Sequence, residues 1–368
     1  RVASDLPSGV VGPFVNDEDK GHTVKRLGRE EGAGPPAMKV QLSKAHDEDD
    51  VDLEEGRGPL DLREAYVLLY PSRMADVKIG RQILTWGTGD LLFINDLFPK
   101  DWQSFFSGRD EEYLKAPSDA VFVGLFPGWA NIGVVYTPRF DADRYIRGER
   151  LSYWNPTLGR LAGEDAVVRA ERPDDWFDDD EIAARVFRNV GGYELAAYGY
   201  DGFWKSPAGF DPASGRATFP RLRVYGAGAR GAALGGVAHA EAGYYDSVDD
   251  DDGDDPTRPN SEIRGLVGYE RELARDFTAA VQYYVEHMED YGAYRAGQGT
   301  GVPARDENRH VLTLRLTRMA MSQNLVLSLF TYYSPSDEDA YLRPSVTYKA
   351  SDRWTTFAGA NVFLGRND

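Results

Sequence analysis

The nine residues VLTLRLTRM, Val311–Met319, alternate between apolar and polar side chains. The leucines fall on one face of an extended chain and the polar residues on the other: Leu312, Leu314 and Leu316 against Thr313, Arg315 and Thr317. Because successive side chains of a β-strand point to opposite faces, this stretch predicts a strand with one apolar face and one polar face.

The same alternation recurs along most of the chain. FTAAVQYYV at Phe277–Val285 is a second clear case, with apolar residues at every other position. In all, the pattern predicts about fourteen strands, at residues 61–70, 75–85, 119–127, 129–139, 181–190, 192–204, 220–230, 234–246, 261–271, 276–288, 308–319, 323–334, 339–349 and 353–364. A further strand is predicted at 37–46, AMKVQLSKAH.

The connections between these strands alternate in length. Short turns such as PSRM and ASDR are followed by long polar segments, at 86–118, 140–180, 205–219, 247–260 and 289–307. Short turns at one end and long loops at the other are typical of outer-membrane barrels. Aromatic residues also gather near strand ends, as in the interfacial girdles of such barrels: Tyr70, Trp86, Trp129, Trp204, Tyr244, Tyr245, Tyr332, Tyr333 and Trp354.

A soluble all-β protein is the alternative to a membrane barrel. Many predicted strand faces carry alanine and glycine opposite a face rich in arginine, glutamate and tyrosine, and a core of such small residues buries little apolar area. A lipid-facing surface tolerates them, but hydrocarbon requires the strands to close on themselves. We therefore predict an all-β fold, a transmembrane antiparallel meander β-barrel of about fourteen to eighteen strands, about sixteen in the complete protein.

Composition excludes several other classes. The chain has 368 residues, a net charge of −18 and no cysteine. An acidic surface argues against nucleic acid as the main partner, because phosphate binding needs basic residues. The absence of cysteine excludes disulfides and cysteine metal sites. The sequence has no run of about 18 apolar residues, so it predicts no transmembrane helix.

Residues 62–102 carry a family resemblance. LREAYVLLY followed by ADVKIGRQILTWGTGDLLFINDLFPKDW is similar to outer-membrane porins of Gram-negative bacteria related to the alginate-export family. The likeness is specific over 61–127 and only architectural over 128–364. It implies a monomeric barrel in the bacterial outer membrane with a water-filled, charged lumen, and it does not identify the solute.

The two ends of the chain depart from that pattern. VASDLPSGVVGPFVND, residues 2–17, resembles a periplasmic segment of resistance-nodulation-division efflux pumps. A chimeric or misassembled gene is the simplest interpretation, and a genuine fusion or a chance match over these residues are the alternatives. We divide the chain into a non-barrel segment, 1–35, and a barrel, 36–368. The last residues, FLGRND, read as the entrance to a turn, and we expect the closing C-terminal strand to be missing.

The segment Gly80–Ser118 is too apolar for a loop in water. It holds leucines, phenylalanines, isoleucines and tryptophans, and an exposed patch of that size would be a liability. We expect residues 86–118 to fold into the barrel as a constriction, with a helical turn near 95–106. An outward loop that docks on a partner is the alternative. The predicted pore-lining and constriction residues are Arg81, Asp90, Asp96, Asp101, Arg109, Arg185, Arg223, Arg264, Arg315 and Arg343.

Other charged groups give weaker signals. Glu194, Glu262 and Glu286 are expected on the lumen face, where mixed charge signs favour a hydrated channel with a local transverse field. His239 and Glu241 share a strand face and could suit an enzyme, but no serine accompanies them. VDDDDGDD, Val248–Asp255, fails the EF-hand template at both ends and reads as an exposed acidic loop that could meet lipopolysaccharide through divalent ions.

These patterns favour a porin for export or diffusion of a polar or anionic solute. The expected partners are outer-membrane lipid, lipopolysaccharide and the solute, with efflux-pump components as a further possibility raised by residues 2–17. We predict no catalytic residues, no metal site and no cofactor. Two alternatives stay open: a barrel enzyme of the lipase or acyltransferase kind, and a non-conducting barrel that serves as partner of an efflux assembly.

Overall fold

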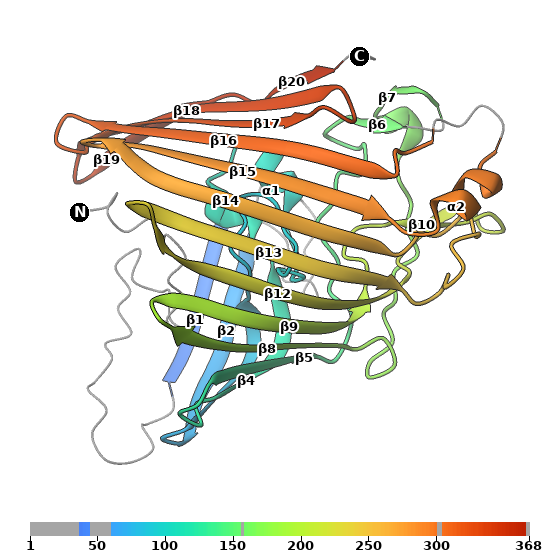
Figure 1. Cartoon of the computed structure of the whole chain (residues 1–368), viewed down its shortest axis with the longest axis horizontal. Helices are drawn as coiled ribbons and strands as arrows, with labels where there is room; N and C mark the ends of the chain where they lie inside the picture. Colours follow the sequence, from blue (N-terminus) through green and yellow to red (C-terminus); the bar gives the residue numbers. More distant parts are fainter. Residues whose placement is uncertain (1–36, 45–59, 156–157, 300–303, 366–368) are drawn as a thin grey trace.

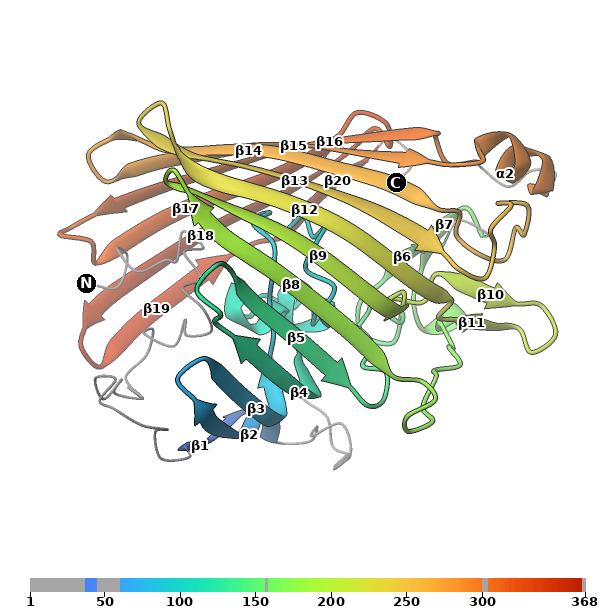
Figure 2. The same ribbon diagram turned by 60° about the horizontal axis from the view of Figure 1, so that its bottom comes forward.

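The computed structural model describes residues 37–44, 60–155, 158–299 and 304–365. It consists mainly of one antiparallel sheet of sixteen strands. Figure 1 shows the strands side by side in chain order, and Figure 2 shows how the sheet curves around an interior. The predicted segment 1–35 and the efflux-pump resemblance at 2–17 lie outside the described residues.

The strands of the main sheet follow the chain. In order they are β1 (Ala37–Lys44), β2 (Leu60–Ser72), β3 (Ala75–Ile83), β4 (Pro117–Leu125), β5 (Asn131–Thr137), β8 (Glu181–Val190), β9 (Tyr193–Phe203), β12 (Arg221–Ala233), β13 (Gly236–Ser247), β14 (Glu262–Ala274), β15 (Phe277–Met288), β16 (Asn308–Ala320), β17 (Leu325–Ser334), β18 (Asp339–Ser351), β19 (Trp354–Gly359) and β20 (Val362–Gly365). From β1 to β19 each strand pairs with its neighbours in this order, and β20 pairs with β18, which confirms the predicted antiparallel meander.

The last strand differs from its prediction. A single strand was expected at 353–364, but it is interrupted at Ala360 and Asn361. β19 and β20 both pair with β18, β19 along Ser345–Ser351 and β20 along Asp339–Leu342. The sheet therefore has fifteen strand positions, with β1 at one edge and the β19–β20 pair at the other.

The remaining elements lie in the long connections. Among the described residues they are two small hairpins, β6 (Tyr153–Asn155) with β7 (Arg160–Ala162) and β10 (Gly209–Asp211) with β11 (Arg216–Thr218), the helices α1 (Trp102–Phe106) and α2 (Tyr291–Gly297), and two short 3₁₀ helices, Glu111–Leu114 and Glu164–Ala166. Short turns gather at one end of the sheet, whereas the hairpins and α2 gather at the other (Figure 1). No helix among the described residues is long and apolar enough to cross a membrane.

The two faces of the sheet differ as the alternation predicts. In β16, Leu312 is 43% exposed and Leu314 is 38% exposed on the convex face, whereas Val311 and Thr313 are 0% and 3% exposed on the concave face. The convex face carries large apolar side chains on most strands: Val67, Ile79, Ile182, Val186, Leu195, Tyr225, Ile263, Val267, Val281, Leu327 and Val346. Such a face needs an apolar neighbour.

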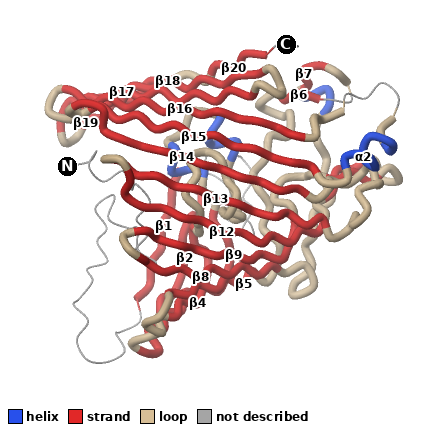
Figure 3. The backbone as a smooth tube through the Cα atoms, viewed as in Figure 1, coloured by secondary structure: helices blue, strands red, loops and turns tan. Residues whose placement is uncertain are grey.

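The concave face is covered by one connection. We call residues 84–116, between β3 and β4, the inner segment. It contains α1, which Figure 3 shows in blue inside the red sheet. A cluster of buried side chains joins the inner segment to nine strands, β4, β5, β8, β9 and β12 to β16: Trp86, Ile94 and Phe98 with Phe122, Val135, Ala183, Tyr200, Val224, Tyr245, Leu266, Tyr284 and Val311 among others.

Candidate functional site

The inner segment leaves β3 through a tight turn. Gly87 has a φ of +83°, in the left-handed region that favours glycine. A Cβ at this position would lie 3.2 Å from a carboxylate oxygen of Glu241 on β13. Glycine therefore lets the backbone approach that carboxylate closely.

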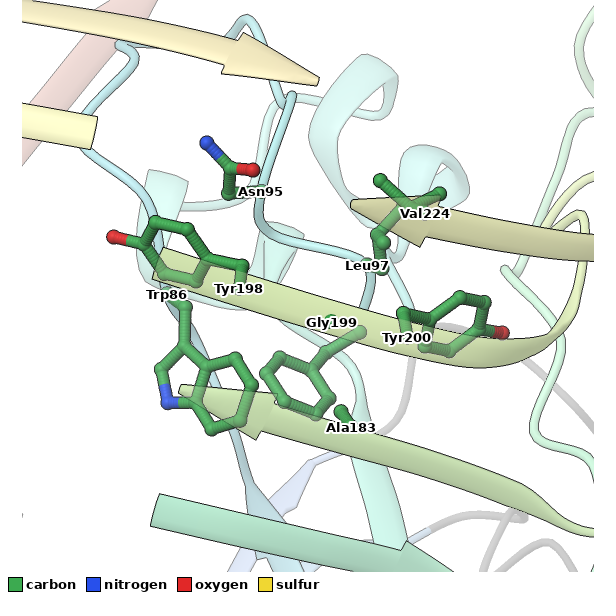
Figure 4. A pocket seen from close by; sticks show the side chains of 9 residues that line it. Trp86, Asn95, Leu97, Ala183, Tyr198, Gly199, Tyr200 and Val224 are labelled. Carbon is green, nitrogen blue, oxygen red and sulfur yellow. The ribbon is translucent and has the colours of Figure 1, made fainter. Parts of the chain in front are cut away.

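Burial of large apolar side chains holds the first part of the inner segment against the concave face of the sheet, whose strands we call the wall. Ile94 is fully buried, and Trp86 and Phe98 are 8% and 6% exposed, with their rings edge to face at 4.9 Å. Only a cavity of about 10 Å³ remains beside them, close to the size of one water molecule. Figure 4 shows it between residues of the inner segment, Trp86, Asn95 and Leu97, and wall residues such as Tyr198.

Glu241 of β13 fixes the same part of the segment by hydrogen bonds. Its carboxylate, in a side chain only 5% exposed, accepts from the backbone N–H and hydroxyl of Thr88 and from the Gly89 N–H at 3.1 Å. It also accepts from the backbone N–H of Asn95 at 3.3 Å and from its side-chain amide at 2.8 Å. A buried carboxylate is stable only when such donors surround it.

Gln282 of β15 provides a second polar contact. Its side-chain carbonyl accepts from the Asp90 N–H at 2.8 Å, and its amide donates to the Asp90 carbonyl at 2.9 Å. The same amide donates to the hydroxyl of Thr313 on β16 at 2.8 Å. Gln282 therefore binds the inner segment to β15 through neutral hydrogen bonds and is itself held by β16.

Ion pairs bind the exposed side of the segment to the later strands. Arg315 of β16 contacts Asp90 at 2.5 Å and Glu111 at 3.2 Å. Arg343 of β18 lies 3.8 Å from Glu111 and donates to the Arg109 carbonyl at 3.0 Å. The side chains of Asp90 and Glu111 remain 34% and 40% exposed. These charges are therefore accessible to water and ions.

Two of the predicted acidic residues have other partners. Asp96 pairs with Lys100 at 3.0 Å and accepts from the Thr85 hydroxyl, both within the inner segment. Asp101 caps α1 by accepting from the Ser104 N–H, and it pairs with Arg144 at 2.9 Å. Of the predicted acids in the inner segment, Asp90 is the one that pairs with a predicted wall arginine, Arg315.

The predicted wall arginines fall into two groups. Arg315 and Arg343 contact the inner segment. Arg185 and Arg264 lie on the concave face but pair with glutamates of the wall, Arg185 with Glu194 and Arg264 with Glu262 and Glu286. The guanidinium of Arg264 also lies 3.9 Å from the ring centre of Tyr245.

Two of the expected lumen arginines lie on the opposite face. Arg223 alternates with Leu222 and Val224, which are 2% and 1% exposed toward the concave side, and it pairs with Asp201 at 2.7 Å on the convex side. The prediction for this residue was wrong. Arg223 lies near the end of β12, and near a strand end a paired charge can face outward at little cost.

Arg81 requires the same correction. It shares a face with Ile79, which is 44% exposed, whereas its neighbour Gln82 is fully buried on the concave side. Arg81 forms a two-point contact with Asp119 on the adjacent strand β4. The alternation of β3 thus assigns the arginine to the convex face, close to the strand end.

Several residues of this site were not predicted. Glu241 was considered only together with His239, and Gln282, Glu111, Arg63 and Arg144 not at all. Each acts through a partner far away in sequence; Glu241 and Asn95 are separated by 146 positions. His239 lies 3.3 Å from Gln282 and is not bonded to Glu241, whose oxygens are occupied by the inner segment. Among the described residues, no group of three or more His, Asp or Glu side chains is arranged to hold a metal ion.

Comparisons with known proteins concern the architecture. No protein-family model and no curated protein sequence matches the chain. It is similar to OmpT, an outer membrane protein of Vibrio cholerae, at 9% identity over 89% of this chain and 85% of that one, with a TM-score of 0.45. It is also similar to the outer membrane channel DcaP of Acinetobacter baumannii, at 10% identity over 89% of this chain and 78% of that one, with a TM-score of 0.43.

A third solved structure is of the same kind. An anion-selective porin from Comamonas acidovorans matches at 11% identity over 83% of this chain and 75% of that chain, with a TM-score of 0.41. At TM-scores below 0.5 the similarity identifies neither a solute nor a site.

Proposed function

We propose that the protein is a channel of the bacterial outer membrane that carries a polar or anionic solute, with the inner segment as its constriction. The observation that carries this proposal is the contrast between the two faces of one curved sheet. Apolar side chains cover the convex face, whereas the concave face combines the apolar cluster that packs the inner segment with charged and hydrogen-bonded side chains. Antiparallel strands of nine to thirteen residues, such as β4 and β12, have the length that spans a bilayer at a tilt.

The charges at the constriction support selection by more than size. Arg315 and Arg343 lie on the wall, and their partners Asp90 and Glu111 lie on the inner segment. Positive and negative charges therefore face each other across a short distance. A solute that passes beside them meets a transverse field of paired charges, and its net charge and its dipole both affect passage.

Conductance in a planar bilayer tests the proposal. The intact protein is compared with a variant in which residues 90–106 are replaced by a short Gly-Ser linker. We expect discrete channels in both, with a higher conductance and weaker charge discrimination in the variant. Absence of channels from well-folded intact protein would contradict the assignment as a channel, and equal conductance would contradict the constriction.

A further inference from the structure

The sheet has two edges, β1 at one end and β19 with β20 at the other, and we call the region between them the seam. All neighbouring strands are antiparallel, so the first and the fifteenth strand positions, β1 and β19, run in the same direction. Among the described residues, no ladder of hydrogen bonds joins β1 to β19 or β20. The inner segment contacts strands close to both edges, β2 through Arg63 and β18 through Arg343.

We propose that residues 101–115 of the inner segment form an internal strut that couples the first strands to the last strands across the seam. This role is separate from conduction and does not depend on it. The strut is defined by α1, by the 3₁₀ turn Glu111–Leu114 and by the residues between them.

The strut is bonded to β2 on one side. Arg63, which is 2% exposed, donates to the backbone carbonyls of Glu112 at 3.2 Å and Lys115 at 2.8 Å. Arg144 extends this contact, because its guanidinium joins Asp61 of β2 to Asp101 at the start of α1. All these charges are paired inside the protein, where such bonds are strong.

The strut is bonded to β18 and β20 on the other side. Arg343 of β18 donates to the Arg109 carbonyl, and its guanidinium lies 4.0 Å from the ring centre of Phe105. Asn361, just before β20, donates to the Phe106 carbonyl at 2.8 Å. The Phe106 ring lies 5.6 Å from that of Phe363 on β20.

The strut itself is internally braced. Asp101 caps α1, and Asp110 accepts from the Glu112 N–H at the start of the 3₁₀ turn. The guanidinium of Arg109 lies 3.7 Å from the ring centre of Tyr113. Two arginines from opposite ends of the sheet, Arg63 and Arg343, thus both donate to main-chain carbonyls of one short, ordered piece of chain.

A distance measurement across the seam tests this role. The chain has no cysteine, so spin labels attach only where cysteines are introduced. Val67 of β2 and Val346 of β18 lie on the convex face at 39% and 40% exposure and suit Val67→Cys and Val346→Cys. We expect a narrow distance distribution between the two labels in the otherwise native, full chain.

The decisive variant combines Arg63→Ala with Arg343→Ala in the doubly labelled protein. Loss of both arginines should broaden the distribution about two-fold or more, because the edges lose their shared support. Arg185→Ala is the matched control, since it removes a buried, paired arginine of β8 that does not contact the strut. An unchanged narrow distribution in the folded double variant would overturn the proposal, as would equal broadening in the control.

If the double variant does not fold, a milder variant tests the same proposal. Phe106→Ala with Asn361→Ala removes contacts with β18 and β20 and leaves both arginines in place. A smaller broadening is then the expected result, and none at all would overturn the strut. Conductance of the same protein separates this proposal from the function, because a channel can conduct whether or not the seam moves.

Discussion

Two glutamates bind the inner segment to the wall in opposite ways. Glu241 belongs to the wall, is 5% exposed and accepts from neutral N–H and O–H donors of the segment. Glu111 belongs to the segment, is 40% exposed and pairs with the charged Arg315 and Arg343 of the wall. The first contact depends on burial and geometry, and the second on charge that water and salt can reach. The same segment is therefore fixed at one end and electrostatically adjustable at the other.

The largest expected effect comes from removing the buried contact. Glu241→Ala leaves the backbone N–H groups of Thr88, Gly89 and Asn95 without an acceptor in a buried position. We expect a loss of about 3–5 kcal/mol in the free energy that holds residues 86–98 to the wall. Hydrogen exchange of these amides measures it.

A wall carboxylate of another kind is the control for that experiment. Glu194→Ala removes a concave-face glutamate that pairs with Arg185 and does not contact the inner segment. In this variant, hydrogen exchange of the backbone amides at 86–98 should match that of the native protein. Native protection in Glu241→Ala would show that apolar packing of Trp86, Ile94 and Phe98 suffices without the carboxylate.

A buried carboxylate outside the strands makes the stability of its connection depend on pH. Asp141, in the connection after β5, accepts from the Asp119 N–H at 3.1 Å and lies near Glu181. Burial, and then the charge of Glu181, raise the pKa of Asp141 to about 6. Because this pKa is raised in the folded state, the stability that the group contributes is present at low pH. It is lost as the pH rises from about 4 to about 6.

Proteolysis of residues 138–180 as a function of pH tests this expectation. The side chain of Asp141 is 21% exposed, which limits the effect to about 2 kcal/mol. Asp141→Asn should make the connection more resistant above pH 6 and remove the pH dependence. Asp165 is an exposed acid in the same connection, and Asp165→Asn should retain the pH dependence of proteolysis. A native-like pH profile in Asp141→Asn would assign the titration to another group.

The charged contact is tested by two equal substitutions on opposite faces. Arg315 and Arg223 are both strand arginines paired with one aspartate, Asp90 and Asp201, but only Arg315 faces the inner segment. Arg315→Gln should shift ion preference toward cations several-fold, because it leaves Asp90 uncompensated and Glu111 with Arg343 alone in a confined path. Arg223→Gln should leave the reversal potential under a salt gradient unchanged. Equal shifts in both would place the path elsewhere.

The sequence was sufficient for the strands and for less of the site. Alternation identified every position of the main sheet, because a two-residue period is a local property that needs no partner. It also assigned Arg315 and Arg343 to the concave face. It failed for Arg81 and Arg223, which lie near strand ends where either face can be hydrated. The contacts of Glu241, Gln282 and Arg63 join residues distant in sequence, so no local pattern could show them.

Salt gives the smallest effect and separates the two glutamates most directly. Raising the ionic strength from about 0.1 to 1 M shortens the screening length from about 10 to 3 Å. The pairs of Glu111 with Arg315 and Arg343 should weaken by less than about 1 kcal/mol, as is usual for partly exposed ion pairs. Hydrogen exchange at residues 107–115 should therefore rise modestly, whereas exchange of the Thr88, Gly89 and Asn95 amides should not change, because Glu241 binds these neutral donors. Glu111→Gln should abolish the salt response at 107–115. A response of equal size at both ends would mean that charge, and not burial, also holds the Glu241 end.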